Sequence, residues 1–399
     1  MLPIKIKEWQ LLLLLACIQF SNILDFVIMM PLSPRLMDVF KISPAEFGFI
    51  VSSYAFSAGF AGILGAFFID RFDRRIALNT CYAGLTLATL LCGVVHTYPL
   101  LVMARILAGA FGGLTGAIIF AIVGDLIPYE RRGKATGVVM SAFSLASVIG
   151  VPAGLYLAEK FNWNAPFFGL FGFSAIVLVF AHFFTPSVKG HLSTLAKHPI
   201  KTLEILFFNK NHLIAFSLIT MMMFGGFSVI PFIAPYLVAN IGLTNAELGY
   251  VYILGGGFTV FTARIIGILA DKFGKPLLFA IIALLSLLPI LAVTNLPKMS
   301  LFVTLTATTC FFVFVSGRFT PALAMITASV HPVNRGSFMS MVSSIQQIAS
   351  GLAASLSGII IQQTANGQLA EFPKVGLVAT GATLIAIYLS TRIKTVSHN

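Results

Sequence analysis

The feature that most limits what this chain can fold into is its series of apolar runs, each about 20 residues long. About 20 apolar residues in a helix cross a hydrocarbon core of roughly 30 Å. Charged residues make up only 10% of the 399 residues, and mean hydropathy is +0.97. A soluble domain carries roughly 25% charge, and the runs lack the alternation of a membrane barrel. The sequence predicts an all-α, multi-pass membrane protein.

The apolar runs fall into two sets of six, which predicts about twelve spans in two pseudo-symmetric halves. The first set lies at residues 10–32, 46–69, 76–95, 99–123, 134–158 and 164–185. The second lies at 212–239, 246–270, 276–294, 300–326, 337–363 and 374–392. We therefore predict an N-terminal six-helix bundle at 1–185, a cytoplasmic linker at 186–211 and a C-terminal bundle at 212–399. The start of the chain lacks a small-residue cleavage signal, which favours a first transmembrane helix over a removable signal peptide.

Lysine and arginine are divided unequally between the two predicted sides. With the N-terminus inside, 17 lie on the cytoplasmic side and five on the outer side: Arg35, Lys41, Lys160, Lys298 and Lys374. The positive-inside rule then predicts that both termini and the linker are cytoplasmic. It also accounts for the net charge of +12 without a nucleic-acid partner. We expect a monomer in a bacterial inner membrane, with lipids around it.

A short charged patch occurs once in each half. Ile69–Arg75 and Ala270–Lys275 have their aspartates 201 positions apart. A second pair of segments, Arg132–Ser147 and Arg335–Ser350, matches at an offset of 203. Two matches with nearly the same offset indicate one unit written twice.

Several motifs resemble those of the major facilitator superfamily. Gly267–Lys275 (GILADKFGK) resembles its signature G-x-L-A-D-[RK]-x-G-[RK] between the second and third helices of each half. The first copy departs from it, because Ala66 and Asp73 replace glycines; Asp73 also adds a charge able to compete for the nearby arginines. Arg105 with the glycines that follow it resembles the R-x-x-x-G motif of the fourth helix, and Asp125–Gly133 resembles the acidic-basic loop after it.

Two further segments narrow the resemblance. Gly150–Gly154 resembles the core of the fifth-helix antiporter motif, although the full motif is not met. Trp163 with Pro166-Phe167 resembles a segment of 12-helix drug:proton antiporters and arabinose-efflux-type permeases. For Gly150, Pro152 and Gly154 the resemblance implies a bend that favours exchange. The alternative is that these residues only let helices pack closely.

The charged patch has two interpretations. By the resemblance, Asp70 faces the start of the eleventh span and Asp271 that of the fifth, where the helix dipole favours a carboxylate. The resemblance also puts Arg74 or Arg75 beside Asp125. Such contacts would form a cytoplasmic latch that holds an outward-open state, whereas a topology-setting charge cluster needs no latch. The predicted latch residues are Asp70, Arg74, Arg75, Asp125, Asp271 and Lys275.

Asp25 is the one acid well inside a predicted span. At 1.5 Å per residue it lies roughly 21 Å from the inner end of the first span, at a depth comparable with Arg105. The first and fourth helices are neighbours in the fold that the resemblance implies. We hypothesise that Asp25 carries the proton, or binds the charge of a cationic substrate, while Arg105 tunes it. The alternative is a structural ion pair between two helices.

Other polar or helix-breaking residues in the spans are weaker candidates. Asn22, Tyr54, Ser144, Gln346 and Gln347 are candidates for a substrate cavity, or for bonds between helices. Arg318 either binds a substrate anion or pairs with another helix. A broken or kinked seventh span is predicted at Gly225, Gly226 and Pro231, as a gate or as an ordinary proline kink.

The sequence contains no metal-ligand cluster, nucleotide-binding loop or paired carboxylates, so no catalytic residue, cofactor, metal or enzyme activity is predicted. Its four cysteines lie in apolar runs and are interpreted as small buried residues. The favoured function is proton-coupled efflux of a small apolar or amphipathic molecule. The alternatives are a sugar or metabolite permease and, in another class, a lipid flippase or a non-transporting scaffold.

Overall fold

The computed structural model describes residues 7–189, 209–331 and 335–395, and these are almost entirely helical. Within the described residues, 11 helical stretches are long and apolar enough to cross a membrane. α16 (Arg335–Ile360) is long enough at 26 residues but is not among the 11, because serine, glutamine and glycine dilute its apolar character. The predicted all-α membrane fold is confirmed. The side of the membrane on which the termini lie stays a prediction.

The chain divides into two compact units, Met1–Met29 with Ser53–Pro199 and Met30–Ser52 with Ile200–Asn399. The division falls inside α3 (Pro44–Phe68). The predicted boundaries at 185 and 212 remain a prediction, and residues 190–208 of the predicted linker lie outside the described residues.

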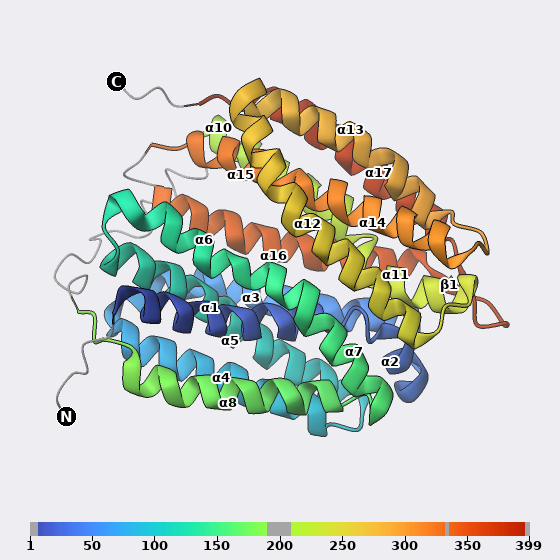
Figure 1. Cartoon of the computed structure of the whole chain (residues 1–399), viewed down its shortest axis with the longest axis horizontal. Coiled ribbons are helices and arrows are strands. Elements are labelled where there is room, and N and C mark those ends of the chain that lie inside the picture. Colours follow the sequence, from blue (N-terminus) through green and yellow to red (C-terminus); the bar gives the residue numbers. More distant parts are fainter. Residues whose placement is uncertain (1–6, 190–208, 332–334, 396–399) are drawn as a thin grey trace. The chain divides into compact units, whose positions relative to one another are not determined.

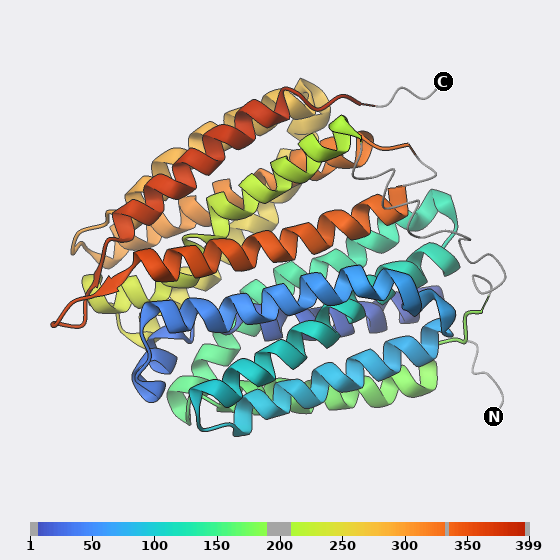
Figure 2. The ribbon, with the colours of Figure 1, turned by 180° about the vertical axis from the view of Figure 1, so that it is seen from behind.

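In the first unit, α4 packs against both α5 and α8, and α1 packs against α6 and α8. Figures 1 and 2 show α4 and α8 side by side from both directions. Its helices are α1 (Glu8–Val27), the C-terminal part of α3 from Ser53, η1 (Ile69–Arg71), α4 (Arg74–Val94), α5 (Tyr98–Leu126), α6 (Tyr129–Leu145), η2 (Ala146–Gly150), α7 (Val151–Lys160) and α8 (Ala165–Phe184).

In the second unit, α10 packs against α16 and α17, while α14 packs against α12 and α13. A two-residue hairpin pairs Gln362 with Ala370. Its elements are α2 (Ser33–Phe40), α10 (Lys210–Phe227), α11 (Ile230–Tyr236), η4 (Leu237–Ile241), α12 (Asn245–Phe273), α13 (Lys275–Thr294), α14 (Leu301–Gly317), α15 (Phe319–Ala328), α16, β1 (Gln362–Gln363), β2 (Leu369–Ala370) and α17 (Phe372–Ser390).

Prolines explain where the structure differs from the predicted spans. The first span was predicted to reach residue 32, but α1 ends at Val27, because Pro31 has no N–H to donate to the carbonyl of Val27. The predicted span 300–326 is interrupted at Arg318. Pro321 lies four residues after Gly317 and cannot donate a helical hydrogen bond to the Gly317 carbonyl. The short helix α2 and the hairpin were not predicted.

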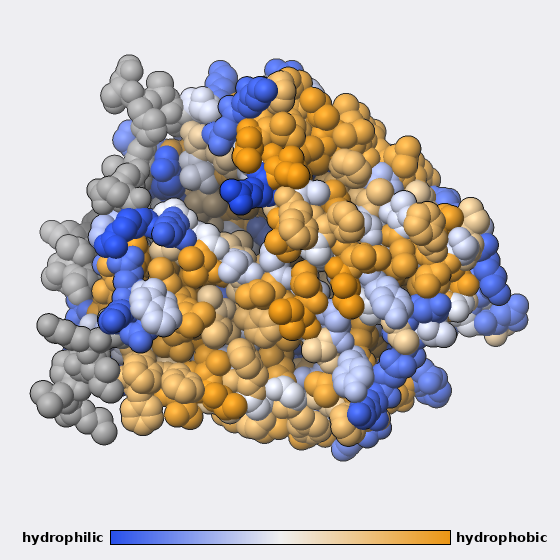
Figure 3. Space-filling view, in the orientation of Figure 1, coloured by the Kyte–Doolittle hydropathy of each residue, from blue (hydrophilic) through white to orange (hydrophobic). Residues whose placement is uncertain are grey.

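Large apolar side chains are exposed along the helices. Phe302 is 79% exposed, Leu288 75% and Phe261 74%. Figure 3 shows apolar residues gathered over α12, α13 and α14, with hydrophilic residues toward the helix ends. Exposure of this kind would cause aggregation in water, so we assign these surfaces to the lipid.

The spanning helices differ in length. α5 and α12 each contain 29 residues, whereas α13 contains 20. At 1.5 Å per residue, the longer helices extend about 43 Å and the shorter one about 30 Å.

Candidate functional site

Asp25 and Arg105 form a buried ion pair in the first unit. Nη1 of Arg105 donates to Oδ2 of Asp25 at 2.9 Å and to its backbone carbonyl at 3.1 Å. Both side chains are 0% exposed. The two residues come from α1 and α5, so the pair joins two membrane-spanning helices. Removing one member would leave the other as an uncompensated buried charge.

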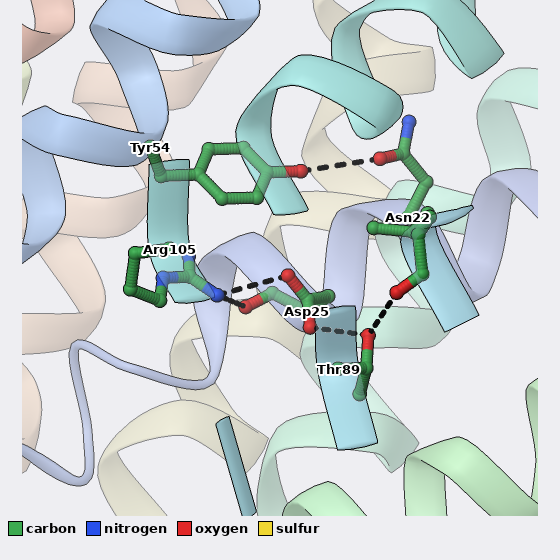
Figure 4. A network of polar contacts seen from close by, with 6 residues as sticks. Asn22, Asp25, Tyr54, Thr89 and Arg105 are labelled. Carbon is green, nitrogen blue, oxygen red and sulfur yellow. Dashed lines mark hydrogen bonds and ion pairs between the residues drawn. The ribbon is translucent and has the colours of Figure 1, made fainter. Parts of the chain in front are cut away.

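The second carboxylate oxygen of Asp25 also has a partner. Thr89 on α4 donates its hydroxyl to Oδ1 of Asp25 at 2.8 Å, and the same hydroxyl lies 3.0 Å from the carbonyl of Leu85. Figure 4 shows Arg105 and Thr89 reaching Asp25 from two sides. The carboxylate therefore joins α1, which carries it, to α4 and α5, and loss of its charge would weaken both of these bonds together.

Tyr54 and Asn22 extend the network by neutral contacts. The Tyr54 hydroxyl donates to Oδ1 of Asn22 at 3.2 Å, and Nδ2 of Asn22 donates to the Gly112 carbonyl at 3.1 Å. The guanidinium carbon of Arg105 lies 4.4 Å from the centre of the Tyr54 ring, within the range of a cation–π contact. Two of the predicted cavity residues thus lie beside the ion pair, and both have protein partners (Figure 4).

Glycines on α5 make this close arrangement possible. A Cβ at Gly112 would collide with the Tyr54 hydroxyl and would lie 2.7 Å from Oδ1 of Asn22. A side chain there would displace both groups. Gly109, the glycine of the R-x-x-x-G resemblance, is constrained in the same way, because a Cβ there would collide with the backbone carbonyl of Tyr54.

The other predicted cavity residues lie elsewhere. Ser144 is half-buried on α6, and Gln346 and Gln347 are half-buried on α16. Arg318, at the junction of α14 and α15, is fully buried. Its Nη1 donates to the Thr383 hydroxyl at 2.9 Å and its Nη2 to the Met222 carbonyl at 3.4 Å.

The predicted latch residues make three different kinds of contact. Nε of Arg74 donates to Oδ2 of Asp125 at 2.9 Å, and the Arg74 side chain is 6% exposed. Arg75 instead donates to the carbonyl of His182. Asp271 is 78% exposed and lies 3.8 Å from Nζ of Lys275. The Asp70 side chain lies outside the described residues. The latch role stays a prediction.

Asp73 does not compete for the arginines as anticipated. One of its oxygens accepts from the Arg75 N–H at 2.9 Å and the Val188 N–H at 3.0 Å, and the other from the Ser187 hydroxyl. Burial alone would raise the pKa of Asp73, but these hydrogen bonds and the charge of Lys189 lower it overall. The aspartate caps α4 and fixes residues 187 and 188 to its start.

The residues predicted to bend helices lie at two interruptions. η2, a π-helical turn, precedes Pro152, and a Cβ at Gly150 would lie 2.8 Å from Leu24. A Cβ at Gly154 would collide with Ile28, so these glycines allow close packing on α1. In the seventh span, α10 ends just after Gly225 and Gly226, and α11 begins next to Pro231.

Sequence reasoning missed Thr89 and Thr383. Each of these threonines also bonds the carbonyl four residues before it, as threonines in transmembrane helices commonly do. They therefore look satisfied within their own helices. The sequence shows only a hydroxyl in an apolar run. That this hydroxyl lies near a buried charge becomes visible only when the helices are packed together.

A sequence model of the Major Facilitator Superfamily matches residues 15–354 and 215–397. The chain belongs to this superfamily. The uncharacterized MFS-type transporter YceJ of Bacillus subtilis (strain 168) is 25% identical, and the matched region covers 94% of this chain and 93% of YceJ. Multidrug resistance protein 2 of the same organism is 23% identical over 92% of each chain.

Solved structures agree on the fold. A D-xylose–proton symporter has a TM-score of 0.79 at 17% identity, covering 96% of this chain and 99% of the symporter. A bacterial homologue of the human lysosomal transporter Spinster has a TM-score of 0.71 at 17% identity, with 96% and 94% coverage. The protein is a multi-pass membrane transporter and not an enzyme.

Proposed function

We propose that this transporter exports a small apolar or amphipathic molecule in exchange for protons. The observation that carries the proposal is the buried Asp25–Arg105 pair. An ionisable group within a membrane span is costly and usually functional. Asp25 is the one acid fully buried among the described residues, so the proton is assigned to it.

Asp25 can couple proton binding to helix movement through its partners. When ionised, the carboxylate accepts from both Arg105 and Thr89. A proton added to it removes the charge that holds the guanidinium and converts one oxygen into a donor. The contacts of α1 with α4 and α5 then weaken together. Two states that differ in these contacts have different affinities for a proton, which is the requirement for coupling.

The name of one relative supports efflux. A relative named multidrug resistance protein matches along 92% of the chain. The abundance of phenylalanine, 38 residues, agrees with an apolar substrate. A bacterial inner membrane, with its proton gradient, is the proposed location, with membrane lipids as surroundings.

Transport in proteoliposomes tests the proposal. A panel of amphiphiles is added outside the proteoliposomes. When one of them is carried into the lumen by wild-type protein, protons should leave in exchange and the lumen should become more alkaline. Asp25→Asn should keep substrate binding but lose substrate-driven proton movement by about a hundredfold or more, the scale of effect of a positioned proton-transfer group. Asp38→Asn is the matched control, because Asp38 is 79% exposed and pairs with Lys41 at the surface.

Other outcomes would select other functions. Unchanged proton exchange in Asp25→Asn would reject the coupling role. Sugar or metabolite flux without counter-moving protons would favour a permease. Translocation of a labelled lipid would favour a flippase, and no flux of any kind would favour a scaffold.

The Arg74–Asp125 contact is assigned to a cytoplasmic latch within the same cycle. Its geometry is that of a partly buried ion pair, and such a pair can bias two conformations by about 1 kcal/mol or more. Asp125→Asn should shift the distribution of distances between spin labels on the two units. An unchanged distribution would leave the pair with a structural role only.

A further inference from the structure

Arg318 is the second fully buried guanidinium, and its surroundings differ from those of Arg105. Its two hydrogen bonds go to neutral acceptors, the Thr383 hydroxyl and the Met222 carbonyl. Within residues 7–189, 209–331 and 335–395, no carboxylate pairs with it, and its Nε has no hydrogen-bond partner. The charge is therefore only partly compensated by the described part of the chain.

Such a charge is energetically unfavourable. The arginine guanidinium does not lose its proton in proteins, so it cannot escape burial by becoming neutral. A buried unpaired charge costs several kcal/mol, and intramembrane arginines face a partner, a cavity or a ligand. A missing counter-ion is the simplest explanation of this arrangement.

Two helix interruptions meet near this arginine. Pro321 withholds the N–H that the Gly317 carbonyl would otherwise accept, and α15 begins directly after Arg318. On α10, just before its own break, a Cβ at Gly225 would lie 2.9 Å from Nη2 of Arg318. In transporters the positive ends of broken helices point at anionic groups of substrates. Here Arg318 lies between the C-terminal end of α14, whose carbonyls favour a cation, and the N-terminal end of α15, whose N–H groups favour an anion.

Polar groups without partners lie on the adjoining segments. Among the described residues, the hydroxyls of Ser228 and Thr380 are buried and make no hydrogen bond. Ser228 is three residues after Gly225, and Thr380 is three residues before Thr383. Each therefore lies within about one helical turn of a residue next to Arg318. The remaining neighbours are apolar: Met222 is fully buried, and Val315 lies beside Gly226.

We propose that Arg318 binds the single anionic headgroup of an amphipathic molecule. A carboxylate or sulfonate would accept from Nε and Nη2 together, the bidentate geometry that favours arginine. Thr383 orients the guanidinium, and the apolar neighbours accept the start of the tail. This inference rests on the proposed transport function and deepens it, because it makes the exported molecule an amphipathic anion.

Equilibrium binding to purified protein in phosphatidylcholine nanodiscs tests the site. The probes are decanesulfonate, decyltrimethylammonium and decanol, which share one tail. Wild-type protein should bind the sulfonate most tightly by calorimetry. Arg318→Gln should weaken it roughly thirtyfold or more, the usual loss when one member of a buried charged contact is removed. Arg318→Lys should retain part of the affinity.

The matched control is Arg264→Gln, which removes the same charge from an exposed position in the same unit and should leave binding unchanged. Equal sulfonate binding by Arg318→Gln and wild type would overturn the proposal, as would tighter binding of the ammonium probe by wild type. If Arg318→Gln does not fold, Thr383→Val removes only the orienting hydroxyl and should weaken sulfonate binding severalfold.

The headgroup can belong to a transported amphiphile or to an anionic membrane lipid. Nanodiscs that contain phosphatidylglycerol distinguish these sources: competition with the sulfonate identifies the lipid, and its absence identifies the free amphiphile. Either result supports the anion site. The binding assay needs no gradient and tests Arg318, whereas the proteoliposome assay measures proton exchange and tests Asp25. Failure of the coupling proposal and failure of the anion site are thereby separated.

Discussion

Each of the two units buries one arginine completely, but in the described part of the chain an acid lies beside only one of them. Arg105 bonds Asp25 within a network of charged, hydroxyl and aromatic groups. Arg318 bonds a hydroxyl and a carbonyl. The sequence repeat makes the two units alike in their helices, whereas the chemistry of these buried charges is different. This difference is the basis of the two proposals, which assign a proton-binding group to the first unit and an anion-binding group to the second.

The largest expected effect is a difference in stability between the two variants that each lack one buried arginine. Arg105→Gln leaves Asp25 buried without its counter-charge and should destabilise the protein by about 3–5 kcal/mol. Arg318→Gln removes a charge that has no described acid partner and should be neutral or stabilising. Thermal unfolding in matched nanodiscs measures both. A larger loss for Arg318→Gln would contradict the comparison.

Giving Arg318 an acid should make the second unit resemble the first. Thr383→Asp places a carboxylate where the hydroxyl now lies 2.9 Å from Nη1. The internal carboxylate should displace bound decanesulfonate, lowering its affinity roughly thirtyfold, without loss of folding stability. Thr383→Asn has a similar shape without the charge and should lower affinity only slightly. Equal effects of the two variants would show that shape, not charge, governs binding.

The smallest effect is expected at the loop acid Asp73, which is held by hydrogen bonds to neutral groups. Its pKa is lowered on folding, from an ordinary value of 3.8. A lowered pKa gives a contribution to stability that is present above pH 3.8 and is lost as the pH falls through the lower, folded-state value. Ser187→Ala removes one hydrogen bond and should move this loss to higher pH. The thermal unfolding temperature, followed from pH 6 to below 3.8, measures the shift.

The membrane class and the repeat could be predicted because burial in lipid leaves a strong compositional signal. The Asp25–Arg105 contact was also within reach, since two rare charged residues at one depth on neighbouring helices have few other partners. Thr89 and Thr383 were not, because a threonine that bonds its own helix gives no sequence signal. Asp73 was misjudged for a related reason: its partners, Ser187 and Val188, are more than 110 positions away.

The positions of helix breaks were predictable only in part. Pro231 marked the interruption of the seventh span, yet Pro321 was read as part of a continuous helix at 300–326. A proline within a transmembrane helix is often tolerated with only a kink. Whether it divides the helix depends on what the neighbouring helices offer, and at Arg318 they offer Thr383 and Met222.

The unequal helix lengths have a mechanical consequence. A helix of about 43 Å is longer than a hydrocarbon core of roughly 30 Å, so α5 must tilt or project into the headgroup region, while α13 need not. Acyl-chain length thereby sets how much of α5 is immersed, and α5 carries Arg105. We expect the transport rate to have an optimum when phosphatidylcholines of increasing chain length are compared. The membrane would then exert a force on α5, the helix whose Arg105 bonds the proposed proton carrier Asp25.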